Sequence, residues 1–191
     1  MFRIIQIFIL WLICLISLHA QSDLNFRPKL LVKELASSNN NVVPELSEIS
    51  LPRNLAQQIY LGAFFRNTSD TPGNSVWYVY IGRVNSCRSG GCSDASETAA
   101  DMAHEYFDYY ILFSENGIVQ RVRVFNYQAT HGEGITAPGW LRQFSGYDGE
   151  KSLTPGKDVD AISGATISVN GISLDVQDKT RLLQEFLRHP Q

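Results

Sequence analysis

Apolar and aromatic residues dominate three segments in the middle of the chain. Residues 76–84 read VWYVYIGRV, and residues 105–113 and 118–128 are similarly rich in β-branched and aromatic side chains. This composition is typical of β-strands. The second and third segments are joined through Glu115-Asn116-Gly117, and an Asn-Gly pair between apolar runs favours a hairpin. The pattern therefore predicts an antiparallel sheet.

Three other segments have the spacing of helices. Leu55 and Ile59 lie four residues apart in residues 52–65, and such spacing places apolar side chains on one side of a helix. A capping-box spacing precedes residues 95–104, and residues 175–188 carry apolar residues at helical spacing. We therefore expect helices in all three segments.

The remaining segments carry more polar residues, glycines and prolines. Residues 21–50 include Ser37-Ser38-Asn39-Asn40-Asn41 and are expected to form a flexible lead-in. Residues 129–160 are rich in glycine and proline, with one ordered island at 138–144. The elements together predict one α+β domain over residues 51–191, built on an antiparallel sheet with packed helices.

The amino terminus has the composition of an export signal. Arg3 is the only charge in residues 1–20, and the run from Ile4 to Leu18 is almost wholly apolar. The run is shorter than the roughly 20 residues that comfortably span a bilayer. We expect a signal peptide cleaved before Gln21, with an uncleaved anchor as the alternative. The protein is then periplasmic, or membrane-associated on the outer side of the inner membrane.

Charge and composition exclude several classes of protein. The chain has 191 residues, of which 44% are hydrophobic and 18% charged, so a wholly disordered chain is excluded. Sixteen Lys and Arg stand against nineteen Asp and Glu, for a net charge of −3. The basic surface that nucleic-acid binding requires is absent, so we expect no nucleic-acid partner.

Three cysteines are too few for a four-thiolate zinc site. Cys14 lies in the leader, and Cys87 and Cys92 enclose four residues. In an oxidising compartment this pair favours a disulfide that pins a loop. A redox-active dithiol, with Arg88 lowering a thiol pKa, and a metal site are the alternatives.

The most informative stretch is residues 160–168, which read DAISGATIS. Gly164 and Ala165 are small enough for a bulky ligand to approach the backbone. Thr166 follows where the chain can enter a helix, and free N–H groups at a helix start favour a phosphate. The residues alone indicate a phosphate site or, equally simply, a turn in which Ser163 or Thr166 caps a helix.

This stretch resembles the flavin-attachment motif of the FMN-binding domain family. That family includes periplasmic domains of the sodium-translocating NADH:quinone reductase and of the related Rnf electron-transport complex. Ala137-Pro138-Gly139-Trp140-Leu141, followed by Phe144-Ser145-Gly146, is similar to a second family motif. The residues that fit the first motif are Asp160, Ser163, Gly164, Ala165, Thr166 and Ser168.

The resemblance implies a covalent flavin. Thr166 would be the attachment residue, and a separate flavin transferase would move FMN from FAD onto its hydroxyl as a phosphoester. The other motif residues would shape the phosphate pocket. Pro138, Gly139 and Trp140 would lie beside the cofactor, with Trp140 either stacked on the isoalloxazine or filling the core. His131, just before the second motif, is either near the flavin or a solvated loop residue.

The function implied is electron transfer by a redox carrier rather than by a stand-alone enzyme. No Gly-x-Gly-x-x-Gly fingerprint is present, so we expect no direct NADH site. The expected partners are the transferase and a redox protein or membrane electron-transport complex. A thiol–disulfide protein using Cys87 and Cys92, and a flavin-free binding module, are the alternatives.

Overall fold

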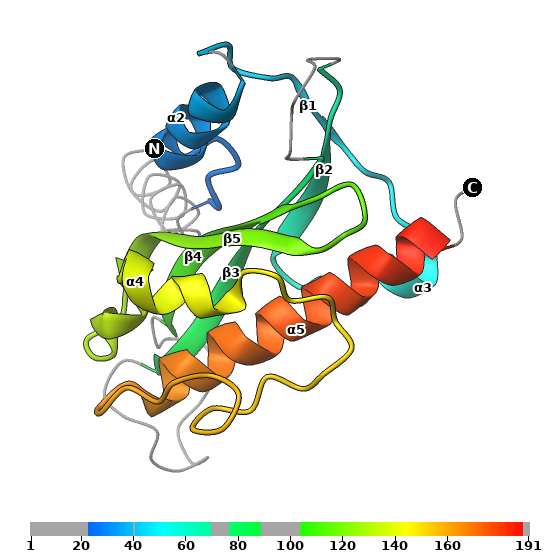
Figure 1. The fold of residues 1–191 in the computed structure, drawn as a ribbon. Helices are drawn as coiled ribbons and strands as arrows, with labels where there is room; N and C mark the ends of the chain where they lie inside the picture. Colours follow the sequence, from blue (N-terminus) through cyan, green and yellow to red (C-terminus); the bar gives the residue numbers. More distant parts are fainter. Residues whose placement is uncertain (1–22, 40, 70–76, 89–103, 189–191) are drawn as a thin grey trace, which may run out of the picture.

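The computed structural model describes residues 23–39, 41–69, 77–88 and 104–188 (Figure 1). The predicted leader lies outside these residues, as does the helix expected over 95–104 except for His104, which begins a strand. The described elements, in chain order, are α2 (Lys29–Ser38), β1 (Leu46–Glu48), α3 (Arg53–Ala56), β2 (Gly62–Asn67), β3 (Tyr78–Arg88), β4 (His104–Phe113), β5 (Val119–Gln128), the 3-10 turn η1 (Glu133–Thr136), α4 (Pro138–Leu141), the 3-10 turn η2 (Arg142–Phe144) and α5 (Thr166–Arg188).

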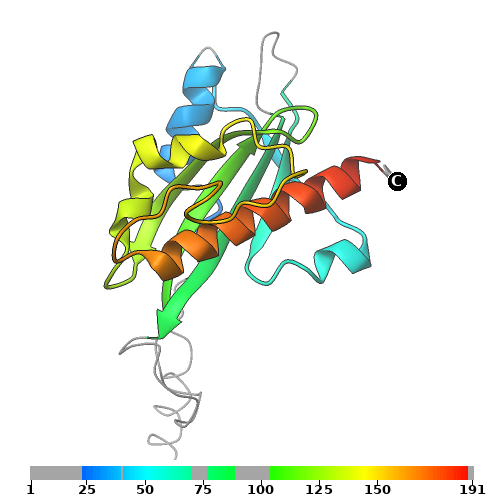
Figure 2. The same cartoon turned by 60° about the horizontal axis from the view of Figure 1, so that its bottom comes forward.

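The strands form one antiparallel sheet in the order β1-β2-β3-β4-β5, so each strand pairs with its neighbours along the chain. Helix α5 crosses one face of the sheet, and α2 lies on the other face (Figures 1 and 2). This arrangement confirms the predicted α+β fold and the three predicted strands.

The central strand β4 is buried on both faces, which explains its continuous run of apolar and aromatic residues. Alternate side chains enter two separate cores. The first core lies between the sheet and α5 and includes Phe64, Tyr80, Phe107, Tyr109, Ile111, Ile172 and Val176. The second core lies between the sheet and α2 and includes Leu31, Leu35, Val79, Ile81, Tyr110 and Leu112.

The turn between β4 and β5 is the predicted Asn-Gly hairpin. Gly117 has a φ of 69°, a conformation that glycine adopts readily. The Gly117 N–H donates to the Ser114 carbonyl (3.1 Å), and the Ser114 N–H donates to the Ile118 carbonyl (2.9 Å). The hairpin is therefore confirmed.

Helix α5 is longer than the sequence predicts, because it begins at Thr166 rather than near residue 175. Ile172, Val176 and Leu183 bury one side of it in the first core. Asp175 accepts a hydrogen bond from the Tyr109 hydroxyl on β4 and forms an ion pair with Lys179 Nζ (2.8 Å). These contacts fix how α5 sits on the sheet. No helix in the described ranges is long and apolar enough to span a membrane.

Residues 52–65 do not form the single helix that the sequence predicts. The chain makes one short helix, α3, and then the strand β2. In β2 the consecutive residues Phe64 and Phe65 contact the first and the second core respectively. Two-sided burial of this kind requires a strand, and it outweighs the helical spacing of Leu55 and Ile59.

Residues 23–50 hold more structure than the predicted flexible lead-in. Helix α2 buries Leu31 and Leu35, which lie four residues apart, and β1 pairs with β2. Glu34 of α2 accepts a hydrogen bond from the Tyr110 hydroxyl on β4. The polar run at Ser37-Ser38-Asn39 marks the end of this helix rather than an unstructured segment.

Candidate functional site

The amino terminus of α5 has no side-chain cap. The Ala165 carbonyl accepts the hydrogen bond of the Val169 N–H (2.9 Å), which makes Ala165 the cap residue. An alanine offers no acceptor, and no acid lies in the first turn. The N–H groups of Thr166, Ile167 and Ser168 have no partner in the described part of the chain. This helix start is therefore electropositive and open to an anion.

Thr166, which carries the first of these N–H groups, has an exposed side chain. Thr166, Ser163 and Asp160 are exposed, whereas Ala165 is buried in the first core. Gly164 has a φ of 76°, and a Cβ added there would meet nothing within 4 Å. The positive φ of the turn therefore favours glycine at this position, whereas the surrounding space would also admit a side chain. The turn leaves room for a bulky group next to Thr166.

Ser168 differs from Thr166 because its hydroxyl is buried and hydrogen-bonded. Its Oγ lies 3.0 Å from the Tyr127 hydroxyl, which donates its own proton to the His131 carbonyl (2.5 Å). Burial raises the pKa of Tyr127, so the phenol keeps that proton at neutral pH. Ser168 is consequently the donor to Tyr127 and is fully engaged in holding the structure together.

The loop before η1 passes very close to this pair. Gly132 has a φ of 93°, and a Cβ added there would lie 2.7 Å from Ser168 Oγ and 2.9 Å from the Tyr127 hydroxyl. Both the conformation and the contact therefore require glycine. His131 itself is exposed and contributes its carbonyl to the site.

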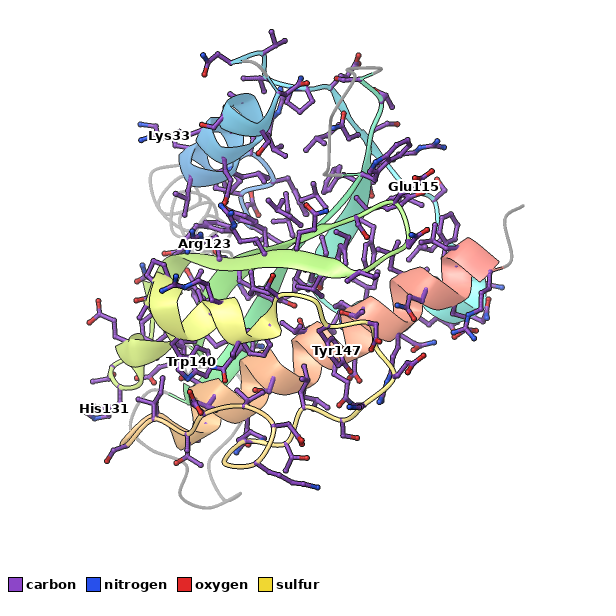
Figure 3. The ribbon with its side chains drawn as sticks, in the orientation of Figure 1. Lys33, Glu115, Arg123, His131, Trp140 and Tyr147 are labelled. Atoms are coloured by element: carbon purple, nitrogen blue, oxygen red, sulfur yellow. The ribbon has the colours of Figure 1, made fainter. Side chains whose placement is uncertain are left out.

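Trp140 joins the two predicted motifs. Its Nε1 donates to the Asp160 carbonyl (3.0 Å), and the Asp160 N–H donates to Gln143 Oε1 (2.7 Å). Gln143 Nε2 in turn donates to the Trp140 carbonyl (2.9 Å). The half-buried Trp140 ring also packs edge-on against Phe144, with 5.5 Å between ring centroids. Trp140 and Gln143 thus bind the backbone carbonyl and the backbone N–H of Asp160. This contact lies at the end of the molecule where α5 begins (Figure 3).

Pro138 and Gly139 are placed differently from Trp140. Both are exposed, and they line a groove beside β5 rather than the start of α5. Pro138 occupies the first turn of α4, where its fixed φ suits a helix start. These two residues therefore begin the turn that positions Trp140.

Tyr127 and Gln143 belong to the site but were not identified from the sequence. Tyr127 sits at the end of β5, where an aromatic residue is expected simply as part of a strand. Gln143 lies inside the island at 138–144, and its position within that island is the only signal that could have indicated it. Tyr127 contacts Ser168 and Gln143 contacts Asp160, and each pair is far apart in the sequence.

The cysteine predictions lie outside the described residues. The backbone of Cys87 pairs with Glu105 in β3 and β4, but its side chain and all of Cys92 are not among the described parts of the chain. The disulfide stays a prediction.

These features define an α+β domain with a site for an anionic group at the start of its last helix. Residues 105–179 match the family model of the FMN-binding domain. The match spans β4, β5, α4 and more than half of α5, and it includes Trp140, Asp160 and Thr166. It confirms the family resemblance seen in the sequence. No curated protein sequence matches the chain.

Proposed function

We propose that the protein is an exported electron-transfer flavoprotein that carries FMN as a phosphoester on Thr166. One observation carries this proposal: an exposed threonine hydroxyl stands at the uncapped start of a long helix, inside the part of the chain that matches the FMN-binding domain. The flavin supplies the redox chemistry, because its ring system accepts and releases one or two electrons.

The residues at the helix start fit a bound phosphate. The free N–H groups of Thr166, Ile167 and Ser168 can donate to phosphate oxygens, and the positive end of the helix dipole favours the negative charge. Gly164 provides the turn that exposes Thr166, and Ala165 anchors that turn in the first core. Asp160 and Ser163, both exposed, complete the segment that a transferase would recognise.

The attachment step requires a second protein. No side chain in the described residues forms a hydrogen bond with the Thr166 hydroxyl, so this part of the chain offers no base for it, and an unassisted threonine is a poor nucleophile. In the proposed reaction Thr166 Oγ bonds to the phosphorus of the FMN half of FAD. The phosphorus–oxygen bond to AMP breaks, AMP leaves, and the hydroxyl proton passes to a base of the flavin transferase.

We assign Trp140 to the environment of the isoalloxazine ring. Its indole orientation is fixed by the hydrogen bond to Asp160, six residues before the attachment threonine. A fixed aromatic face suits stacking with a planar ring. Pro138 and Gly139 contribute by starting the turn that places Trp140.

Export and covalent attachment support each other in this proposal. The apolar segment at residues 4–18 favours secretion, and a flavin held only by weak contacts would be lost by dilution outside the cytoplasm. The electron partners are then a redox protein or a membrane electron-transport complex. The chain would be periplasmic or membrane-associated on the outer side of the inner membrane.

The decisive experiment compares three hydroxyl variants. Each variant is co-expressed with a flavin transferase, denatured and analysed by peptide mass mapping. Thr166→Ala should lose the covalent flavin completely, while Ser163→Ala, the matched exposed control, should still carry it at Thr166. Thr166→Ser should retain some attachment because a hydroxyl remains. A flavin that maps to Ser163 or Ser168 in the unmodified sequence contradicts the proposal.

A further inference from the structure

A groove runs along the outer edge of β5. Since β5 is the last strand of the sheet, one of its edges pairs with β4 and the other faces away from the sheet. Val119 uses this outer edge to pair with the following loop, through the Gly146 N–H (2.8 Å) and the Tyr147 carbonyl (2.9 Å). From Arg121 onward, no other described segment makes backbone hydrogen bonds with that edge. Within the described part of the chain, this edge therefore presents backbone donors and acceptors that have no partner.

The groove has the shape of a slot for an extended chain. Its volume is about 410 Å³, and four consecutive β5 residues, 120–123, line one side of it. Successive side chains of a strand point to opposite faces, so a groove that touches four in a row follows the strand edge. The residues from the α4 and η2 side are Pro138, Gly139, Leu141, Arg142 and Ser145. In Figure 1 this edge lies between α2 and α4.

The groove is strongly basic although the whole chain is acidic. Arg121, Arg123 and Arg142 line it, in a chain whose net charge is −3. Glu34 is the carboxylate that faces them: it pairs with Arg121 and lies 4.0 Å from Arg123 Nε. Arg142 is exposed and has no ion pair among the described residues. Three guanidinium groups therefore line the groove, and the ion pairs of Glu34 involve only Arg121 and Arg123.

We propose that this β5 edge groove binds an extended acidic segment of a partner protein, which adds to the sheet as a further strand. Backbone hydrogen bonds to the free edge provide binding, and alternate side chains provide specificity. Arg121 and Arg123 lie two residues apart and share one face of the sheet, so the segment should carry acidic residues at alternate positions. A second copy of this chain is disfavoured, because its own arginines would meet these three.

The test uses a short acetylated peptide of alternating Glu and Thr, titrated into the ¹⁵N-labelled Thr166→Ala protein, which carries no flavin under the proposed function. Amide resonances of residues 120–123 and 138–145 should shift. Arg123→Glu and Arg142→Glu should each weaken binding by about tenfold or more, since a charge attraction becomes a repulsion. Arg188→Glu, an exposed site at the end of α5, should leave it unchanged. Because no flavin is present, the result is independent of flavin attachment.

Two further peptides test strand addition itself. A Lys-Thr peptide of the same length should not bind, and a Glu-Thr peptide with N-methylated backbone amides should bind at least tenfold more weakly. Equal binding of the methylated peptide, or displacement by free glutamate at similar concentration, would show that the arginines only collect carboxylates and would overturn the proposal. Absence of any binding would overturn it too, leaving the arginines as protection against edge-to-edge pairing.

Discussion

Three hydroxyl groups lie within six residues of each other at the candidate site, and their surroundings separate them. Ser168 is buried and donates to Tyr127, whereas Ser163 and Thr166 are exposed. Only Thr166, of these two, lies in the helix itself. From the sequence the three side chains look alike as attachment sites, and only the motif resemblance favours Thr166. Burial and hydrogen bonding then give a physical reason for the ranking.

The role of Ser168 and Tyr127 can be tested with Tyr127→Phe. The substitution removes the phenol that links Ser168 to the His131 carbonyl. We expect a loss of about 1 kcal/mol in the free energy of unfolding, measured with urea, because a part-buried hydrogen bond is removed. Covalent flavin should still map to Thr166. Tyr60→Phe is the control, since Tyr60 is 88% exposed and should change stability very little. Equal stability of the two variants would contradict the assignment.

At the scale of elements, the sequence predicts the strands and helices whose pattern of apolar residues matches the burial of their side chains. β3, β4 and β5 are rich in aromatic and β-branched residues, and the Asn-Gly turn identifies the β4–β5 hairpin. The motif at residues 160–168 indicates a possible helix entry at Thr166, but the apolar spacing predicts α5 only from residue 175, because its first turns carry polar residues and a glycine, Gly171. The cap residue of this helix is Ala165, whose side chain has no hydrogen-bond acceptor, and this leaves the helix start open to an anion.

The open start of α5 gives a prediction for the flavin-free protein. Thr166→Asp places a negative charge in the first turn and should stabilise the fold by about 0.3–1 kcal/mol, while Thr166→Lys should destabilise it by a similar amount. Thermal unfolding at low salt measures both. The matched control is Asn170→Asp, which lies beyond the first turn and should have a smaller effect. If both aspartates stabilise equally, or neither does, the helix start is not electropositive in the way described.

At the scale of the whole molecule, the sheet contains a buried ion pair that links three strands. Arg83 on β3 donates to Asp108 on β4 through Nε (2.6 Å) and Nη2 (3.1 Å), and Asn126 on β5 donates to the same carboxylate (2.8 Å). The Arg83 guanidinium also stacks on the Tyr106 ring at 3.8 Å. Hydrogen bonding to Asp108 raises the pKa of Arg83, so the guanidinium keeps its charge. No sequence pattern indicated it, since the partners are 25 residues apart.

Breaking this pair should affect the entire fold. Asp108→Asn removes the carboxylate charge that accepts two hydrogen bonds from the buried Arg83 guanidinium, and it should cost about 3 kcal/mol in the free energy of unfolding. Asp178→Asn, an exposed position on α5, is the control and should cost little. The double replacement Arg83→Met with Asp108→Leu should recover much of the loss, because apolar side chains then replace both buried charges. A double variant as unstable as the single one would show that packing, not charge, determines the effect.

The alanine cap of α5 also bears on how long each form of the protein survives. A serine or asparagine there would typically stabilise the helix by about 1 kcal/mol without any modification. Under the proposed function, a chain with this alanine cap and no attached phosphate should open locally more often at this end, and proteases cleave locally opened segments. Under the proposed function, turnover therefore removes the unmodified chains faster, and the standing population becomes enriched in those that carry the cofactor.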